Sequence, residues 1–326
     1  CNLRCAMCVK QSGPGIADDF LSGATFEMLI PAFPTLETLI LNGVGEPLLH
    51  PDLEEFIRRA RHHLSESASI GFQTNGTLLD DSWCRFLAAE KFMVGISIDG
   101  PDEFHNINRH FSAGKPSLAR VLRGYELLRK HQVTTEILCV VNSFNAGYPL
   151  AVYDFFRNIG AENITFLPLV EPRPDLPGGV TPASVSADAF GSFLIAIFDE
   201  WVEKDIGRIK IQIFEEAART AFNQEHTLCI FRENCGAVPV IEANGDFYSC
   251  DHFVNSENLV GNIRNNSVAG LLYSDKQKAF GLAKSGSLPY YCKICDVRTM
   301  CNGECPKNRF ITAPDGEPGL NYLCSG

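Results

Sequence analysis

The sequence opens with CNLRCAMC (residues 1–8), which places Cys1, Cys5 and Cys8 in the spacing CxxxCxxC. Three thiols are an odd number for disulfides, and they are one short of the four ligands that a structural zinc ion takes. Three thiolates on a four-iron cluster leave one iron without a protein ligand, and that iron can bind a small molecule directly. The spacing therefore predicts a loop that holds an open iron–sulfur cluster.

Composition narrows the class of protein and of partner. The chain has 326 residues and a net charge of -11, which argues against nucleic acid as a main partner because phosphate contacts need clustered Lys and Arg. No run of eighteen apolar residues occurs, so we expect no membrane span. Because the sequence begins on a motif cysteine, we expect no signal peptide, and we expect the start to be truncated before the strand that would precede a cluster loop. Because oxygen attacks open clusters, we expect a cytoplasmic location under anaerobic conditions.

The first 205 residues alternate between strand-like and helix-like segments, a rhythm typical of parallel βα units. Five strands are predicted, and a sixth is implied before Cys1, so we expect an α/β fold with a partial, open (β/α)6 barrel. A further short strand is possible at 208–214. The predicted strands are 36–43, 69–76, 92–101, 134–142 and 163–170, and the predicted helices are 52–64, 80–91, 117–131, 150–160 and 188–205.

Three polar or glycine-rich segments follow predicted strands, as the cysteine loop would follow the implied one. They are NGVGEP (42–47), QTNGT (73–77) and SIDGP (97–101). Ligands of such folds bind at the carboxyl ends of the strands. We therefore expect these segments to line one site, although each alone would be an ordinary turn or helix cap.

The rest of the chain changes character. We expect a linker helix over 206–228 and a second, cysteine-rich domain over 229–326, in which Asn244-Gly245 predicts a β-hairpin. This domain contains eight of the thirteen cysteines, enough for two four-ligand sites, whereas Cys84 and Cys139 are expected to be buried apolar residues. Spacing alone leaves zinc and iron–sulfur clusters equally favoured; the motif at the start of the chain favours iron. The eight are Cys229, Cys235, Cys250, Cys292, Cys295, Cys301, Cys305 and Cys324.

Taken together, these motifs resemble the radical S-adenosylmethionine (SAM) superfamily with its SPASM extension. The SPASM pattern is met by residues 245–250, by CxxCxxxxxCxxxC over 292–305 and by Cys324. Residues 73–87, 94–106 and 305–324 resemble anaerobic sulfatase-maturating enzymes, as does Asp251 directly after Cys250. Two features depart from the family pattern: GVGEP stands where GGEP is usual, and Val9-Lys10 replace an aromatic pair.

The resemblance implies three [4Fe-4S] clusters and SAM as cofactors. Cys1, Cys5 and Cys8 would bind the open cluster, whose free iron chelates SAM. By resemblance, Cys229, Cys235, Cys250 and Cys305 would hold an inner auxiliary cluster, and Cys292, Cys295, Cys301 and Cys324 an outer one. Spacing alone would instead group the four cysteines of 292–305.

The strand-end segments supply the expected SAM contacts. Gly43, Gly45 and Glu46 would approach the methionine part of SAM, since glycine permits close backbone contact. Ser97 and Asp99 would bind the ribose hydroxyls. Gln73 and Asn75 are expected at the same mouth, and Arg109 would meet the SAM carboxylate or a substrate group.

The resemblance also implies an activity and partners. Asp251 would be the general base in the oxidation of a Cys or Ser in a peptide of an unfolded sulfatase to Cα-formylglycine. A flavodoxin or ferredoxin would supply electrons. Two alternatives stay open at this point: a maturase that forms a thioether or other crosslink in a ribosomal peptide, and a zinc-stabilised binding module without redox chemistry.

Overall fold

A computed structural model describes residues 1–8, 20–42 and 45–326. The chain divides into two compact units. We call the first the barrel unit (Cys1–Phe20, Ile30–Leu169 and Phe193–Gln212) and the second the cysteine-rich unit (Leu21–Leu29, Val170–Ser192 and Ile213–Gly326). Among the described residues, no helix combines the length and the apolar character needed to cross a membrane.

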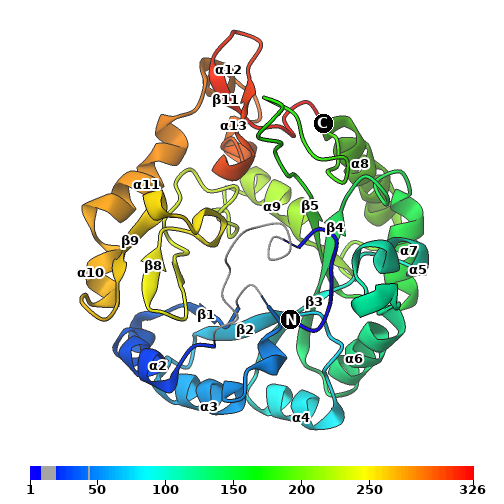
Figure 1. Cartoon of the computed structure of the whole chain (residues 1–326). Coiled ribbons are helices and arrows are strands. Elements are labelled where there is room, and N and C mark those ends of the chain that lie inside the picture. The colour runs from blue at the N-terminus through cyan, green and yellow to red at the C-terminus, as the bar shows by residue number, and fades with distance from the viewer. Residues whose placement is uncertain (9–19, 43–44) are drawn as a thin grey trace. The chain divides into compact units, whose positions relative to one another are not determined.

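A parallel sheet forms the centre of the barrel unit. Within the described residues it has six strands, each paired with its neighbour in chain order (Figure 1). The predicted α/β class and parallel βα organisation are therefore confirmed, and the sixth strand comes from the 208–214 segment. The strands are β1 (Thr38–Ile40), β2 (Ser69–Thr74), β3 (Met93–Ser97), β4 (Thr134–Val141), β5 (Asn163–Pro168) and β6 (Lys210–Ile211).

Helices connect these strands and cover the outer face of the sheet (Figure 1). Their apolar faces supply fully buried side chains such as Ile57, Leu87 and Phe156, which remove apolar surface from water. Asp80 caps the helix that begins at Asp81, because its carboxylate accepts from the N–H of Trp83 at 2.8 Å. These helices are α3 (Leu53–His63), α4 (Asp81–Ala89), α5 (Asp102–Asn108), α6 (Leu118–Lys130), α7 (Pro149–Asn158) and α8 (Ala187–Lys204).

The cysteine-rich unit is built from short elements. The predicted hairpin is confirmed: β7 (Val240–Ile241) pairs antiparallel with β8 (Asp246–Tyr248), and Gly245 takes the positive φ of 87° that the turn requires. β9 (Leu259–Asn262) completes that sheet, and β10 (Ile311–Thr312) pairs with β11 (Pro318–Leu320). The helices are α2 (Gly23–Leu29), α9 (Gln212–Ala221), α10 (Val268–Leu272), α11 (Asp275–Gly286), α12 (Tyr290–Lys293) and α13 (Arg298–Cys301).

One close backbone contact connects the helical layer to a strand end. A Cβ atom at Gly124, in α6, would lie 2.3 Å from the carbonyl oxygen of Gly76, in the turn that follows β2. Only glycine at position 124 lets the helix approach this turn, which carries Asn75 and Thr77.

We expect Gly124→Ala to destabilise the protein by about 1–3 kcal/mol, the usual cost of forcing a methyl group into a packed interior. The clash is with backbone, so no side-chain rotation relieves it. The midpoint of thermal unfolding should fall. Gly147→Ala is the matched control, because a Cβ there meets none of the described atoms within 4 Å. Equal midpoints for the two variants would contradict the contact.

Candidate functional site

The loop of residues 1–8 is held by backbone hydrogen bonds to the segment after α5. The N–H of Arg4 donates to the carbonyl of His110, and the N–H of Ala6 donates to that of Asn108, both at 2.8 Å. These bonds flank Cys5 on either side. A turn closes the loop, with the N–H of Cys8 on the carbonyl of Cys5 at 3.1 Å. The three predicted ligand residues are thus on one loop with a defined backbone.

Asn75, at the end of β2, holds the other side of this loop. Its side-chain amide donates to Asn2 Oδ1 at 2.9 Å and to the sulfur of Cys1 at 4.0 Å. Asn2 in turn donates to the hydroxyl of Thr77 at 2.8 Å. Asn75 therefore lies at the predicted mouth, and in this structure its side chain contacts the cysteine loop.

Glu46 connects the glycine-rich segment to the same strand end. Its carboxylate accepts from the Thr74 hydroxyl at 2.6 Å and from the N–H groups of Asn75 and Leu48, at 2.8 and 3.3 Å. Burial raises the pKa of this carboxyl group, and these hydrogen bonds partly offset the rise. A Cβ atom at Gly45 would meet none of the described atoms within 4 Å, and Gly43 lies outside the described residues.

Asp99 and Arg109 form a buried ion pair. Arg109 donates from Nε and Nη2 to the two carboxylate oxygens of Asp99, at 2.7 and 3.1 Å. The N–H of Val140 also donates to Asp99, at 2.9 Å. The Asp99 side chain is 0% exposed, and its predicted contact with the ribose hydroxyls stays a prediction. Ser97 is partly exposed and Gln73 is exposed.

The eight cysteines of the second unit fall into two groups by mutual electrostatic influence. In addition to burial, electrostatic repulsion from Cys235 and Cys229 contributes to the raised pKa of Cys305, and repulsion from Cys305 contributes to the raised pKa of Cys250. Separately, in addition to burial, electrostatic repulsion from Cys301 and Cys295 contributes to the raised pKa of Cys292 and of Cys324. These interactions agree with the grouping that the family resemblance implies, and which four cysteines share a cluster stays a prediction.

Burial raises the pKa of the Cys250 and Cys305 thiols to about 12. It also raises the pKa of the thiols of Cys229, Cys235, Cys292, Cys301 and Cys324. Backbone N–H groups nearby oppose this rise: those of His252, Lys307 and Gly303 donate to Cys250, Cys305 and Cys301. Soft thiolates that receive N–H hydrogen bonds are the environment in which iron–sulfur clusters are held, and metal binding displaces the thiol protons. The donor sets therefore fit two four-thiolate clusters.

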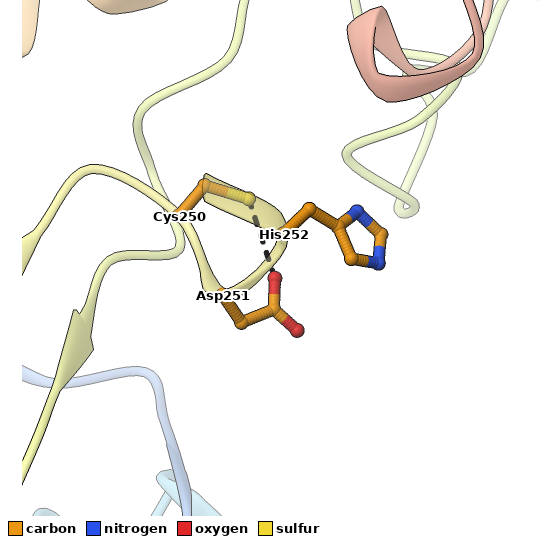
Figure 2. Close-up of side chains that lie close together, drawn as sticks. All are labelled: Cys250, Asp251 and His252. Carbon is orange, nitrogen blue, oxygen red and sulfur yellow. Dashed lines mark hydrogen bonds between the residues drawn. The ribbon is translucent and has the colours of Figure 1, made fainter. Parts of the chain in front are cut away.

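Asp251 lies beside the predicted ligand Cys250, at the start of a short 3-10 helix (Asp251–Phe253). Figure 2 shows the Asp251 carboxylate facing the Cys250 sulfur, whose thiol donates to Oδ1 at 3.2 Å. The ligand atoms of Cys250, Asp251 and His252 lie within 4.8 Å of one another. The carboxylate is exposed, so a partner molecule can reach it.

Sequence reasoning missed three side chains at the cysteine groups. His252 Nδ1 lies 3.5 Å from Cys305 Sγ. Lys284 is buried and donates to the carbonyls of Cys229 and Ile230, at 2.9 and 2.7 Å. Arg309 donates to the carbonyls of Lys284, Asn302, Gly303 and Glu304, and it interacts electrostatically with cysteines of both groups. His252 has a sequence signal, its place two residues after Cys250; the two cations have none, because their positions depend on the folded loops.

Two sequence families match the chain. The profile of the Radical SAM superfamily matches residues 1–155, and that of SPASM, an iron-sulfur cluster-binding domain, matches residues 229–296. Two curated relatives are similar over nearly the full chain. A serine-type anaerobic sulfatase-maturating enzyme of Bacteroides thetaiotaomicron is 39% identical, covering 100% of this chain and 84% of that protein. A cysteine-type enzyme of Clostridium perfringens is 30% identical, with coverages of 99% and 90%.

Solved structures agree with these matches. A structure described as native anSMEcpe with bound AdoMet and Cp18Cys peptide superposes with a TM-score of 0.86 at 29% identity, covering 100% of this chain and 91% of that one. Streptococcus suis SuiB bound to S-adenosylmethionine, at 15% identity and a TM-score of 0.71, shares the fold. The chain belongs to the anaerobic sulfatase-maturating enzymes of the radical SAM superfamily.

Proposed function

We propose that this enzyme oxidises a Cys or Ser in a peptide segment of an unfolded sulfatase to Cα-formylglycine. The observation that carries the proposal is the full-length identity of 39% to a serine-type and 30% to a cysteine-type maturating enzyme. A solved relative of 29% identity is described with both AdoMet and a peptide bound. The reaction would take place in an oxygen-poor cytoplasm, with a flavodoxin or ferredoxin as electron donor.

The ligand sets follow the groups described above. Cys1, Cys5 and Cys8 bind an open [4Fe-4S] cluster, and the two cysteine groups of the second unit bind one closed cluster each. When bound, these clusters and SAM supply a 5′-deoxyadenosyl radical that takes a hydrogen atom from the target Cβ, and they accept the remaining electron. Glu46 fixes the backbone of Asn75 and thereby the cysteine loop, and Gly45 leaves room for the methionine part of SAM.

Asp251 is the general base of this proposal. It accepts the proton of the target thiol or hydroxyl while Cβ loses a hydrogen atom and an electron leaves, which yields a C=S or C=O double bond. Water then converts the thioaldehyde to formylglycine with release of hydrogen sulfide. When Cys250 becomes a metal ligand its thiol proton is displaced, so Asp251 loses the donor it has here and its carboxylate can accept from the substrate.

Reduced enzyme incubated anaerobically with SAM and a peptide bearing the Cys/Ser-x-Pro-x-Arg sulfatase motif should yield formylglycine, seen by mass spectrometry. We expect Asp251→Asn to lower its formation at least a hundredfold, because positioned general bases contribute factors of this size. Iron content should be unchanged. Asp275→Asn, the same change at an exposed helix start, is the matched control.

Cleavage of SAM without any change in the peptide would contradict the proposed function. A peptide that gains an internal crosslink would assign the enzyme to crosslinking maturases instead. Full activity of Asp251→Asn would remove the base from this position and leave the overall reaction standing.

The two groups of cysteines predict which pairs of cysteines bind the same cluster. Cys250→Ala with Cys305→Ala should cost about four irons per chain, because both ligands belong to one cluster, whereas Cys305→Ala with Cys324→Ala should cost about eight. Iron analysis of the reconstituted proteins checks this. Cys84→Ala, at a buried helix position of the barrel unit, should retain all irons. A loss of only four irons from Cys292→Ala with Cys305→Ala would instead support the grouping by spacing.

A further inference from the structure

Helix α11 buries a polar face in the cysteine-rich unit. The buried residues of this helix are Gln277, Gly281 and Lys284. They are four and three residues apart, so they lie on one side of the helix. An amphipathic helix usually buries an apolar stripe instead. Each of these three residues, which we call the α11 polar face, contacts the backbone at or beside a cysteine assigned to the inner auxiliary cluster.

Gln277 binds the backbone beside two of these cysteines. Its Nε2 donates to the carbonyl of Gly236 at 2.9 Å and to that of Ser249 at 3.2 Å. Gly236 directly follows Cys235, and Ser249 directly precedes Cys250. One side chain therefore connects two segments that carry ligands of the same cluster.

Gly281 and Lys284 contact ligand residues themselves. The N–H of Cys235 donates to the carbonyl of Gly281 at 3.1 Å. A Cβ atom at Gly281 would lie 2.7 Å from the Cys235 carbonyl oxygen, so glycine is needed for this approach. One turn further along the helix, Lys284 Nζ donates to the carbonyls of Cys229 and Ile230, at 2.9 and 2.7 Å.

Lys284 is buried without an anionic partner. It is 1% exposed, and among the described residues both of its acceptors are neutral carbonyls and no carboxylate forms an ion pair with it. The buried carboxylate of Glu304 accepts from Asn308 and Asn321 instead. A buried ammonium group without a nearby anion is strongly unfavourable. The protein therefore places a lysine where an anion is expected nearby.

The sulfur of Cys229 lies close to this ammonium group. The carbonyl oxygen that accepts from Lys284 Nζ and the sulfur of the same cysteine are separated by a few covalent bonds. Nζ therefore lies within about 8 Å of that sulfur, whichever rotamer the cysteine adopts. The thiolate ligands of an iron–sulfur cluster would supply the missing negative charge at this range.

We propose that Lys284 is the counter-ion of the inner auxiliary cluster and that its charge raises the reduction potential of this cluster. The proposal rests on the ligand assignment made under the proposed function. A four-iron cluster with four thiolate ligands is anionic, and reduction adds one more negative charge. A cation held at this distance therefore stabilises the reduced form more than the oxidised form.

A purely structural role of Lys284 predicts the opposite sign. If the side chain only tied residues 229–230 to α11, its loss would loosen the loop and admit water to the cluster. Water stabilises the more highly charged reduced form, so the potential would rise. Loss of the positive charge lowers the potential instead, and a charged replacement restores it.

The test is a redox titration of the reconstituted full chain without SAM or peptide, followed by electron paramagnetic resonance. The component absent from Cys250→Ala with Cys305→Ala identifies the inner cluster. For Lys284→Met we expect an about tenfold lower equilibrium constant for reduction, which for one electron is about 59 mV. Lys284→Arg should titrate like the unchanged protein. Lys276→Met is the matched control: Lys276 lies on the same helix and donates to the carbonyl of Leu259 at 2.8 Å, but it is exposed.

A lower potential in Lys284→Met, with none in Lys284→Arg or Lys276→Met, supports the proposal. An unchanged or raised potential in Lys284→Met overturns it, as does an equal decrease in either of the other two variants. Should Lys284→Met fail to assemble the inner cluster, Lys284→Gln, which keeps an N–H donor without the charge, is judged in the same way.

If Lys284→Gln also loses the cluster, the iron content of Lys284→Arg decides. A full complement of iron supports the proposal, because the charge is then required for assembly, whereas a loss of about four irons overturns it. The titration contains neither SAM nor peptide, so a negative result leaves the formylglycine assay unaffected. Inactivity in that assay likewise does not alter the titration, and the two failures are distinguishable.

Discussion

The loop of residues 1–8 has no helix or strand of its own, so its conformation depends on hydrogen bonds from elsewhere in the barrel unit. Asn75 holds it at Cys1 and Asn2, and the carbonyls of Asn108 and His110 hold it around Cys5. Three thiols can bind one face of a cluster only if their loop is already shaped for it, because ordering a free loop costs about 1–2 kcal/mol per residue. The parallel sheet matters for function because it brings these holding segments to one edge.

The loops of the cysteine-rich unit must also be fixed by contacts with other segments, and here buried cations supply many of these contacts. The unit's apolar cluster around Phe247, Ile263 and Leu271 is small, and buried cations bind loop carbonyls where a larger core would otherwise fix the loops. Lys284 binds the 229–230 backbone and Arg309 binds that of residues 302–304. Such loops gain stability when metal binds, since the free energy of metal binding becomes free energy of folding. The two cations also place positive charge beside thiols that become anionic when they bind iron.

A positively charged side chain therefore lies near each group of cysteines. Arg109 is bound by a buried carboxylate, whereas Lys284 and Arg309 are bound by backbone carbonyls. A carboxylate partner opposes most of the arginine's charge, while neutral carbonyls leave the lysine and arginine charges in place. The three clusters would consequently experience different local fields, and an electron that moves among them would respond to those differences.

Sequence alone determined the α/β class, the order of strands and helices, the hairpin at Asn244-Gly245 and the cysteine chemistry, because each depends on local periodicity, turn residues or ligand spacing. The partnership of Cys305 with Cys229, Cys235 and Cys250 had to be taken from family resemblance, since spacing indicated another grouping. Only the tertiary structure decided that Asp99 pairs with Arg109, and that the buried Lys284 donates to the carbonyls of Cys229 and Ile230. These features depend on which loops meet in space, and contacts between residues distant in the chain leave no periodic trace in the sequence.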